Sequence, residues 1–330
     1  AEGEVRLNTE KPVRMDYTGQ YQRYFHESYL RQIIQRPWLA GTAIWNEFDF
    51  SQPNIGGPAP HMNQKGLVTW DRKPKDAYYL YKANWNPEPM VYIASRDWAI
   101  RGGEKGFFST IDVYSNGATV NLSVNGVAQK SQAVNDLKRA TWKVALKEGV
   151  NLLTATTKIN GKTITDNFTI EYKAYDAKLA SFNNDLSINS GSDAQYIDPS
   201  GNVWIEDRPY QPGSFGYTGG QYKNLDRKDV IKNTVHEPML YSYLDSVQGY
   251  RFDVPDGDYR ITLSFAEPLR LKKGNRVFSV TANDQTIIRD LDLADEYGFA
   301  TTTTQTFIVK AINGEGVQLR FVPQKGNAIL

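Results

Sequence analysis

Two stretches of sequence decide the organisation of the amino-terminal part of the chain: Gly41-Thr-Ala-Ile-Trp-Asn-Glu-Phe-Asp-Phe50 and Lys65-Gly-Leu-Val-Thr-Trp-Asp-Arg-Lys-Pro-Lys-Asp-Ala-Tyr-Tyr-Leu-Tyr-Lys-Ala-Asn-Trp85. The apolar run from Leu39 to Phe50, polar at its carboxyl end, predicts a buried strand. Pro74 to Lys82 predicts a helix with proline near its first turn. Aromatic residues at helical spacing predict an amphipathic helix over residues 16–36. Helix, strand, loop and helix follow one another in the order that a βα barrel requires.

These stretches resemble the last βα unit of the (β/α)8 barrel in family 2 glycoside hydrolases, the β-galactosidase and β-glucuronidase family. A complete barrel needs roughly 250 residues and eight strands. Only about 85 residues precede a change of character at Pro87 and Pro89. We therefore expect this chain to be the carboxyl-terminal piece of a larger enzyme, whose upstream part completes the barrel. The apolar end, Phe321 to Leu330, favours a chain that is cut at both ends.

The spacing of apolar residues changes from about residue 88 onward. Val120 to Val124 alternates apolar with polar residues, as half-buried strands do. Asn125-Gly126 and Asn160-Gly161 are strong hairpin signals. The pattern predicts a small antiparallel sandwich over residues 88–174. The segment Val113-Tyr-Ser-Asn116 resembles the immunoglobulin-like domains that follow the barrel in the same hydrolase family.

A predicted linker from Tyr172 to Ser181 leads into a third domain, over residues 175–330. Short alternating strands with Asp-Gly and Gly-rich turns predict a β-sandwich there. Several separate motifs resemble malectin-like carbohydrate-binding domains: Ile188-Asn-Ser-Gly191, Tyr196-Ile-Asp-Pro-Ser-Gly-Asn-Val-Trp204, Tyr210-Gln-Pro-Gly-Ser-Phe-Gly-Tyr217, Tyr250-Arg-Phe-Asp-Val-Pro-Asp-Gly-Asp-Tyr259, Leu263-Ser-Phe-Ala-Glu267, Gly274-Asn-Arg-Val-Phe278 and Ala328-Ile-Leu330.

The predicted fold class is multidomain. Residues 1–87 are expected to form the end of a (β/α)8 TIM barrel that is incomplete in this chain. Two all-β sandwiches follow it: an immunoglobulin-like domain at 88–174 and a malectin-like jelly roll at 175–330.

Composition narrows the function classes. The net charge is +1 and no basic tract is present, which argues against nucleic acid as a partner. No apolar stretch is long enough to span a bilayer. Cysteine is absent, which excludes disulfides and thiolate metal sites. The 20 Tyr and 7 Trp suit stacking on carbohydrate, although β-rich cores also use aromatic side chains.

Retaining glycosidases need two carboxylic acids, roughly 5–5.5 Å apart. The family resemblance implies that the nucleophile lies a few positions upstream of Ala1 and the acid/base further upstream. We therefore expect no catalytic residue in this chain, and we expect the chain alone to be inactive. Glu2 and Glu4 are interpreted as solvated carboxylates in a βα loop. The implied double displacement requires no cofactor.

Three residues are candidates for contact with the sugar. Trp45 ends the predicted strand at the face where barrel active sites sit, and the family uses a Trp here as a wall of the −1 subsite. The alternative is a Trp that packs the barrel rim. Asn63 and Lys65 resemble the Asn-x-Lys pattern with which β-glucuronidases hold the uronate. Similar Asn-Lys-Gly stretches also occur in β-galactosidase-like members of the family, so the pattern does not choose between the two sugars. The other alternative is a solvated loop lysine. Glu47 and Asp49 are expected to make hydrogen bonds at the rim.

In the third domain the candidate carbohydrate contacts are Phe215, Tyr217, Tyr196 and Tyr222. Glycines flank Phe215 and Tyr217, so we expect these two on loops. Trp204 is expected in the core. The three histidines are far apart in the sequence and lack partners at ligand spacing, so no metal site is predicted.

The predicted function is that of the carboxyl-terminal portion of a retaining exo-β-glycosidase that releases terminal β-linked sugars from glycans. β-Galactosidase is the first expectation and β-glucuronidase the alternative within the family. A non-catalytic carbohydrate-binding or structural module is the rival from another class. The expected partners are a glycan substrate and the upstream part of the same polypeptide, without nucleic acid or membrane; a homo-oligomer is left open. Resemblance alone implies a secreted or periplasmic location.

Overall fold

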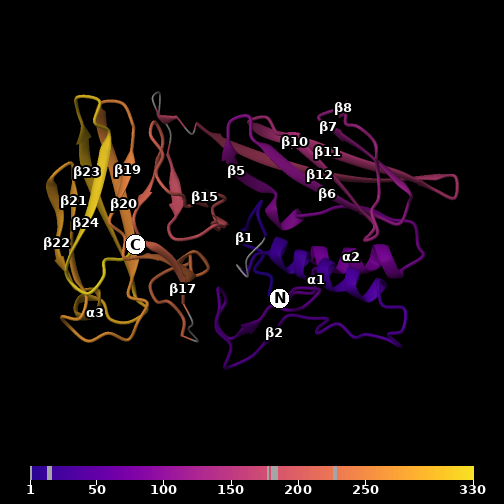
Figure 1. The fold of residues 1–330 in the computed structure, drawn as a ribbon, viewed down its shortest axis with the longest axis horizontal. Helices are drawn as coiled ribbons and strands as arrows, with labels where there is room; N and C mark the ends of the chain where they lie inside the picture. The colour runs from indigo at the N-terminus through magenta and orange to yellow at the C-terminus, as the bar shows by residue number, and fades with distance from the viewer. Residues whose placement is uncertain (1, 13–16, 177, 180–184, 226–228) are drawn as a thin grey trace. The chain divides into compact units, whose positions relative to one another are not determined.

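The computed structural model describes residues 2–12, 17–176, 178–179, 185–225 and 229–330 (Figure 1). The chain divides into two compact units. The first runs to Ile55 and continues from His61 to Ala174; the second takes Gly56 to Pro60 and Tyr175 to Leu330. β-Strands dominate both units. None of the described helices has the length and apolar character needed to cross a membrane.

The two predicted helices of the first unit are present. Helix α1 spans Gly19–Ile34 and begins after Thr18, whose hydroxyl accepts a hydrogen bond from the Tyr21 amide at 3.0 Å. Such a cap satisfies one of the free amides at a helix start. Helix α2 spans Asp76–Trp85. The predicted start of the first helix, Asp16, lies outside the described residues.

The buried face of α1 is polar, contrary to the face that its aromatic residues predicted. The residues buried on this helix are Gln20, Gln22, Arg23, His26, Glu27 and Leu30. Tyr24 and Tyr29, in contrast, are 48% and 53% exposed. Hydrogen bonds satisfy much of the polar face, as described below. The described part of the chain does not cover the two tyrosines.

The predicted buried strand over Leu39–Phe50 is wrong for this chain. Only β2 (Phe50–Ser51) forms at its end, and it pairs with β3 (Met62–Asn63). Residues 39–43 are exposed. A strand needs hydrogen-bonding neighbours along its length, and the described residues supply a partner only for the end of this run.

An antiparallel sandwich completes the first unit (Figure 1). Its strands are β4 Val91–Ile93, β5 Ile100–Glu104, β6 Phe108–Ser115, β7 Thr119–Val124, β8 Val127–Ala128, β9 Gln132–Ala133, β10 Arg139–Ala145, β11 Gly149–Ile159 and β12 Lys162–Tyr175. One sheet has the order β10-β6-β4 and the other β5-β12-β11-β7-β8, with β9 on β7. Both predicted Asn-Gly turns are confirmed: Asn125-Gly126 joins β7 to β8, and Asn160-Gly161 joins β11 to β12. All four turn residues have positive φ.

The helices pack on the sandwich of the same unit. Leu30 of α1 and Leu80 of α2 share an apolar cluster with Tyr114 of β6. The rings of Tyr79 and Tyr92 stack with centroids 3.6 Å apart. A short strand β1 (Leu7–Asn8) and a 3-10 turn (Arg96–Trp98) complete the unit.

The second unit is a β-sandwich with its own core. Its elements are β13 Ser187–Asn189, β14 Gln195–Ile197, β15 Val203–Glu206, β16 Phe215–Thr218, β17 Gln221–Asn224, a 3-10 turn Met239–Tyr241, β18 Ser242–Asp245, β19 Gly249–Phe252, β20 Gly257–Ala266, β21 Val277–Ala282, β22 Gln285–Leu291, α3 Leu293–Glu296, β23 Thr302–Ala311 and β24 Val317–Lys325. The main sheet has the order β16-β19-β24-β21-β22, and β20 pairs with β23.

The predicted linker from Tyr172 to Ser181 begins inside a strand, because β12 continues to Tyr175. Its residues 177, 180 and 181 lie outside the described residues.

The histidine between the two helices gives the first unit a pH dependence. His26 is 5% exposed and lies 3.1 Å from the Tyr81 hydroxyl. Burial lowers its pKa from 6.5 to about 4. Between these values the unfolded chain binds a proton that the folded chain does not, so stability falls as the pH drops through this window.

We expect the free energy of unfolding of the first unit to fall by up to about 1.4 kcal/mol per pH unit from pH 6.5 to about 4. His26→Gln keeps a partner for Tyr81 and should flatten this slope. Denaturant unfolding followed by tryptophan fluorescence measures it, because every tryptophan except Trp204 lies in the first unit. An equal slope in both proteins would contradict the assignment.

Candidate functional site

Two backbone segments of the first unit bring the sugar-contact candidates together. The amide of Asn46 donates to the carbonyl of Lys65 at 3.5 Å, and the amide of Leu67 donates to the carbonyl of Asn46 at 3.0 Å. The amide of Val68 donates to the carbonyl of Glu47 at 2.9 Å, and Phe48 and Val68 form a parallel bridge. The segment that carries Trp45 therefore runs beside the loop that carries Lys65.

Trp45 presents its ring to solvent. Its side chain is 69% exposed, and its only described ring contact is an edge-to-face one with Phe50, with centroids 6.3 Å apart. The peptide bond between Trp45 and Asn46 is cis. An exposed flat ring beside polar side chains can cover the apolar face of a sugar.

Asn63 ends β3 and is only 4% exposed, whereas Lys65 lies in the loop that follows this strand. The carboxamide of Asn63 donates to Gln52 Oε1 at 2.8 Å, and its oxygen accepts the amide of Lys65 at 3.1 Å. The ammonium of Lys65 pairs with Glu2 at 2.5 Å, and its side chain is 33% exposed. An ammonium has three N–H donors. The bond to Glu2 uses one of these donors.

A buried ion pair lies directly beneath this loop. Lys75 and Asp49 are 2.8 Å apart, with side chains only 5% and 6% exposed. Burial lowers the pKa of Lys75, and Asp49 only partly offsets this. Burial likewise raises the pKa of Asp49 against the opposing effect of Lys75. The structure thus places Asp49 in a buried ion pair below the loop, not in the predicted hydrogen bonds at a rim, while Glu47 is exposed.

The carbonyl of Gln64 accepts three hydrogen bonds at the centre of the loop. Its donors are the Gly3 amide at 3.1 Å, Gln22 Nε2 at 3.2 Å and Lys75 Nζ at 3.0 Å. The side chain of Gln64 donates to Glu4 at 3.0 Å. Glu2 and Glu4, predicted to be solvated, are instead partnered. Burial raises the pKa of Glu4, but its bonds to Arg6 hold the pKa below the ordinary value.

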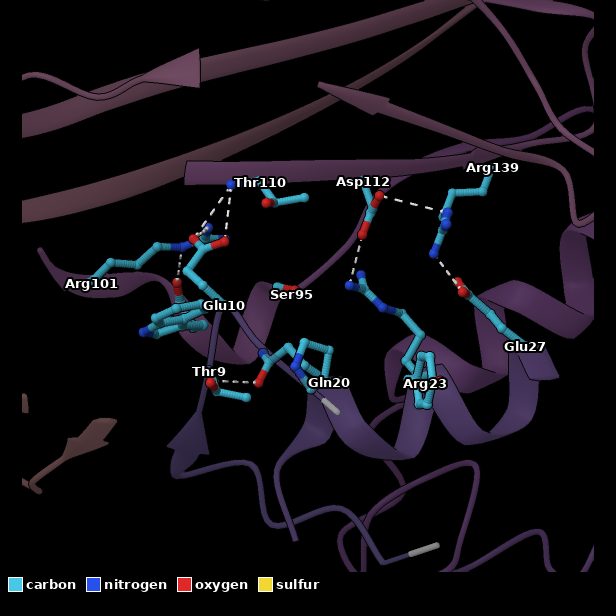
Figure 2. Close-up of a pocket in the computed structure, with 13 residues that line it drawn as sticks. Thr9, Glu10, Gln20, Arg23, Glu27, Ser95, Arg101, Thr110, Asp112 and Arg139 are labelled. Carbon is cyan, nitrogen blue, oxygen red and sulfur yellow. Dashed lines mark hydrogen bonds and ion pairs between the residues drawn. The ribbon is translucent and has the colours of Figure 1, made fainter. Parts of the chain in front are cut away.

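A polar cavity of about 110 Å³ lies between α1 and the sandwich of the same unit (Figure 2). Arg23 binds Asp112 at 2.7 Å, and Arg139 binds Glu27 at 2.5 Å (Figure 2). Glu10 accepts the amide of Thr110 at 3.1 Å. Acidic and basic side chains of the helix pair here with side chains of the opposite charge on the sandwich. The arrangement fastens α1 to β6 and β10, and none of the predicted site residues lies in it.

No cluster of residues able to hold a metal ion occurs among the described residues.

In the second unit, the aromatic candidates divide by exposure. Tyr196 and Phe215 are 0% exposed, so their rings cannot stack on a sugar in this structure. Phe215 and Tyr217 lie on strand β16, not on loops as predicted. Tyr217 and Tyr222 are half-buried, with ring centroids 5.5 Å apart. Trp204, predicted in the core, is half-buried, and its indole N–H donates to Asp198 at 3.3 Å.

Sequence reasoning missed Lys75 as part of the site. One signal could have found it. Lys75 occupies the position before the first residue of α2 and makes no side-chain cap. A lysine is unfavourable there, because the helix start favours capping acceptors and negative charge. A residue that goes against the sequence preference of a helix start indicates that its side chain has a partner elsewhere in the fold.

Both units of the chain resemble known proteins. Residues 184–329 match the family described as the malectin domain. The chain is 40% identical to a β-glucuronidase of Bacteroides fragilis over 157 residues, which covers 46% of this chain and 22% of that protein. It is 29% identical over 136 residues to a β-galactosidase of Bacteroides ovatus, covering 38% of this chain and 14% of that protein.

A solved β-glucuronidase of Bacteroides uniformis matches the whole chain, with a TM-score of 0.92 and 29% identity. The match covers 40% of that protein. A second structure, described as B. uniformis β-glucuronidase 2 covalently bound to cyclophellitol-6-carboxylate aziridine, matches with a TM-score of 0.90, 29% identity and coverage of 100% of this chain and 40% of that one. The chain thus carries a malectin domain and is homologous to the carboxyl-terminal region of family 2 β-glucuronidases and β-galactosidases. The predicted resemblances to malectin domains and to family 2 glycoside hydrolases are confirmed. The immunoglobulin-like and barrel-end assignments stay predictions.

The loop geometry depends on the absence of a side chain at Gly66. A Cβ added there would lie 2.3 Å from the Asp49 amide nitrogen and 2.5 Å from the Val68 carbonyl oxygen. Both neighbours are backbone atoms, so neither can move aside without a cost in free energy. Gly66→Ala should lower the free energy of unfolding of the first unit by roughly 1–3 kcal/mol. Gly41→Ala is the matched control, since no atom lies within 4 Å of its added Cβ. Equal effects in denaturant unfolding would contradict the packing.

The burial of Phe215 predicts a structural role. Phe215→Ala should destabilise the second unit by about 3–5 kcal/mol, seen as a lower unfolding temperature in calorimetry. Ile308→Ala, at a position of β23 in the same unit that is 67% exposed, is the control. A Phe215→Ala protein with unchanged stability but weaker sugar binding would instead restore Phe215 as a ligand contact.

Proposed function

We propose that this chain is the carboxyl-terminal portion of a retaining exo-β-glycosidase of family 2 that releases terminal β-glucuronic acid. The whole-length likeness to the B. uniformis β-glucuronidase carries the proposal. The catalytic acid/base and nucleophile are assigned to the part of the polypeptide upstream of Ala1. The residues of this chain then bind and orient the sugar.

The geometry of the loop supports a substrate that bears a carboxylate. Lys65 offers an ammonium that is partly exposed, next to the carboxamide of Asn63. An ammonium paired with a carboxylate forms a short, charge-assisted hydrogen bond. The bound 6-carboxylate compound in the B. uniformis structure is consistent with such a group. Trp45 would cover the apolar face of the same sugar.

Exposed apolar surface supports the proposal that residues 1–87 form the last part of a (β/α)8 barrel. Trp38 is 75% exposed and Trp85 54% exposed. An open hollow of about 410 Å³ lies between the segment at Ile44 and α2, lined by Tyr78 and Tyr81. Large exposed apolar patches mark surfaces that another element covers. The preceding βα units of the parent polypeptide are the proposed cover.

β-Galactosidase, the first expectation from the sequence, is unconfirmed, and a β-galactosidase also stands among the relatives. The glucuronidase assignment is preferred because solved β-glucuronidase structures match the whole chain. A carbohydrate-binding role for the second unit rests on its malectin match and on Tyr217 and Tyr222, which are half-buried where Tyr196 and Phe215 are fully buried. Export to the periplasm or beyond, and a homo-oligomer, stay predictions.

The test compares turnover of aryl β-glucuronide and aryl β-galactoside by the longest polypeptide that contains this chain. We expect glucuronide turnover, and no turnover by this chain alone. Lys65→Ala should lower kcat/KM for the glucuronide by about 10- to 100-fold, the effect of losing a hydrogen bond to a charged group. The same variant should change galactoside turnover far less. Galactoside turnover alone would overturn the glucuronidase assignment, and activity of this chain alone would overturn the upstream location of the catalytic acids.

A further inference from the structure

The buried ammonium of Lys75 holds together segments that are distant in the sequence. It donates to Asp49 at 2.8 Å, to the carbonyl of Gln64 at 3.0 Å and to the carbonyl of Gly3 at 3.3 Å. These acceptors belong to the Trp45 segment, the Asn63–Lys65 loop and the amino-terminal segment that carries Glu2. We propose that Lys75 is a positioning residue, which fixes the Asn63–Lys65 loop in the conformation that receives the sugar.

The contact with the loop falls between the two candidate sugar ligands. Gln64 separates Asn63 from Lys65, and its carbonyl is the atom that Lys75 binds. Asp49, the partner of Lys75, accepts the amide of Gly66 at 2.9 Å, one residue beyond Lys65. The loop is thus held at the centre and at its end by one buried ion pair. Side chains that must meet a ligand in a fixed geometry need this kind of support.

The same ammonium also places the partner of Lys65. Lys75 binds the carbonyl of Gly3, and the neighbouring Glu2 pairs with Lys65 while accepting the amide of Gln64 at 2.9 Å. Movement of Gly3 would carry Glu2 with it. Lys75 therefore sets both the backbone under Lys65 and the carboxylate that orients its ammonium.

The control residue lies two positions away. Lys73 pairs with Asp71 at 2.7 Å, but its side chain is 79% exposed and that of Asp71 is 55% exposed. An exposed pair of this kind contributes little. Lys73→Met and Lys75→Met make the same chemical change on the same short segment, one outside the loop and one beneath it.

The first measurement uses the 330-residue chain and needs no activity. Hydrogen exchange followed by NMR or mass spectrometry reports the protection of the Gln64 and Gly66 amides. Lys75→Met should speed their exchange at least about tenfold, because Asp49 and Gln64 lose their shared donor. Lys73→Met should leave it unchanged. The double variant Asp49→Asn/Lys75→Met leaves no unpaired buried charge, so it keeps the test open if Lys75→Met alone fails to fold. Unchanged exchange at Gln64 and Gly66 in the folded variant would overturn the proposal.

The second measurement rests on the proposed function and uses the longest polypeptide containing this chain. A positioning role predicts that Asp49→Asn/Lys75→Met raises KM for the aryl β-glucuronide about tenfold or more relative to the aryl β-galactoside. A purely structural role would lower the active fraction and so reduce kcat equally for both. Equal losses would overturn the positioning role. If the parent protein turns over no glucuronide at all, the proposed function fails, while the exchange result still decides whether Lys75 holds the loop.

Discussion

The buried pair of Lys75 and Asp49 is the constraint on which the candidate site depends. An ammonium removed from water must find acceptors, or its burial becomes very costly. Lys75 meets this demand with Asp49 and with the carbonyls of Gly3 and Gln64. The same requirement that satisfies the charge therefore fixes three backbone segments relative to one another. The hydrogen bonds of Lys75 therefore also fix the positions of Asn63 and Lys65.

A second set of buried charges fixes the helix layer against the sandwich. Arg23 and Glu27 of α1 meet Asp112 and Arg139 of the two facing strands (Figure 2). Such pairs add little net stability, because desolvation offsets their attraction, but removing one partner is costly. Their geometry is specific to one placement of α1. The polar inner face of this helix thus fixes its orientation, while Tyr24 and Tyr29 of the same helix are exposed.

Local sequence signals predicted the elements whose formation is local. The Asn-Gly turns at 125–126 and 160–161 formed as expected, because the turn itself requires left-handed residues. The run from Leu39 to Phe50 failed as a strand, since a strand exists only with neighbours. Phe215 was misplaced because its flanking glycines were interpreted as loop formers. Gly216 instead lies within β16, where an added Cβ would meet the Arg208 carbonyl oxygen at 2.4 Å. Lys75 escaped notice because Gly3 lies 72 residues away.

The most direct measurement is a crystal structure of the longest polypeptide containing this chain, with a carboxylate-bearing uronic acid inhibitor bound. The account predicts the inhibitor carboxylate within hydrogen-bonding distance of Lys65 Nζ and Asn63 Nδ2, with the Trp45 ring against the sugar. Lys75 should still bind the carbonyl of Gln64. An inhibitor carboxylate held by other residues, with Lys65 paired only to Glu2, would contradict the account.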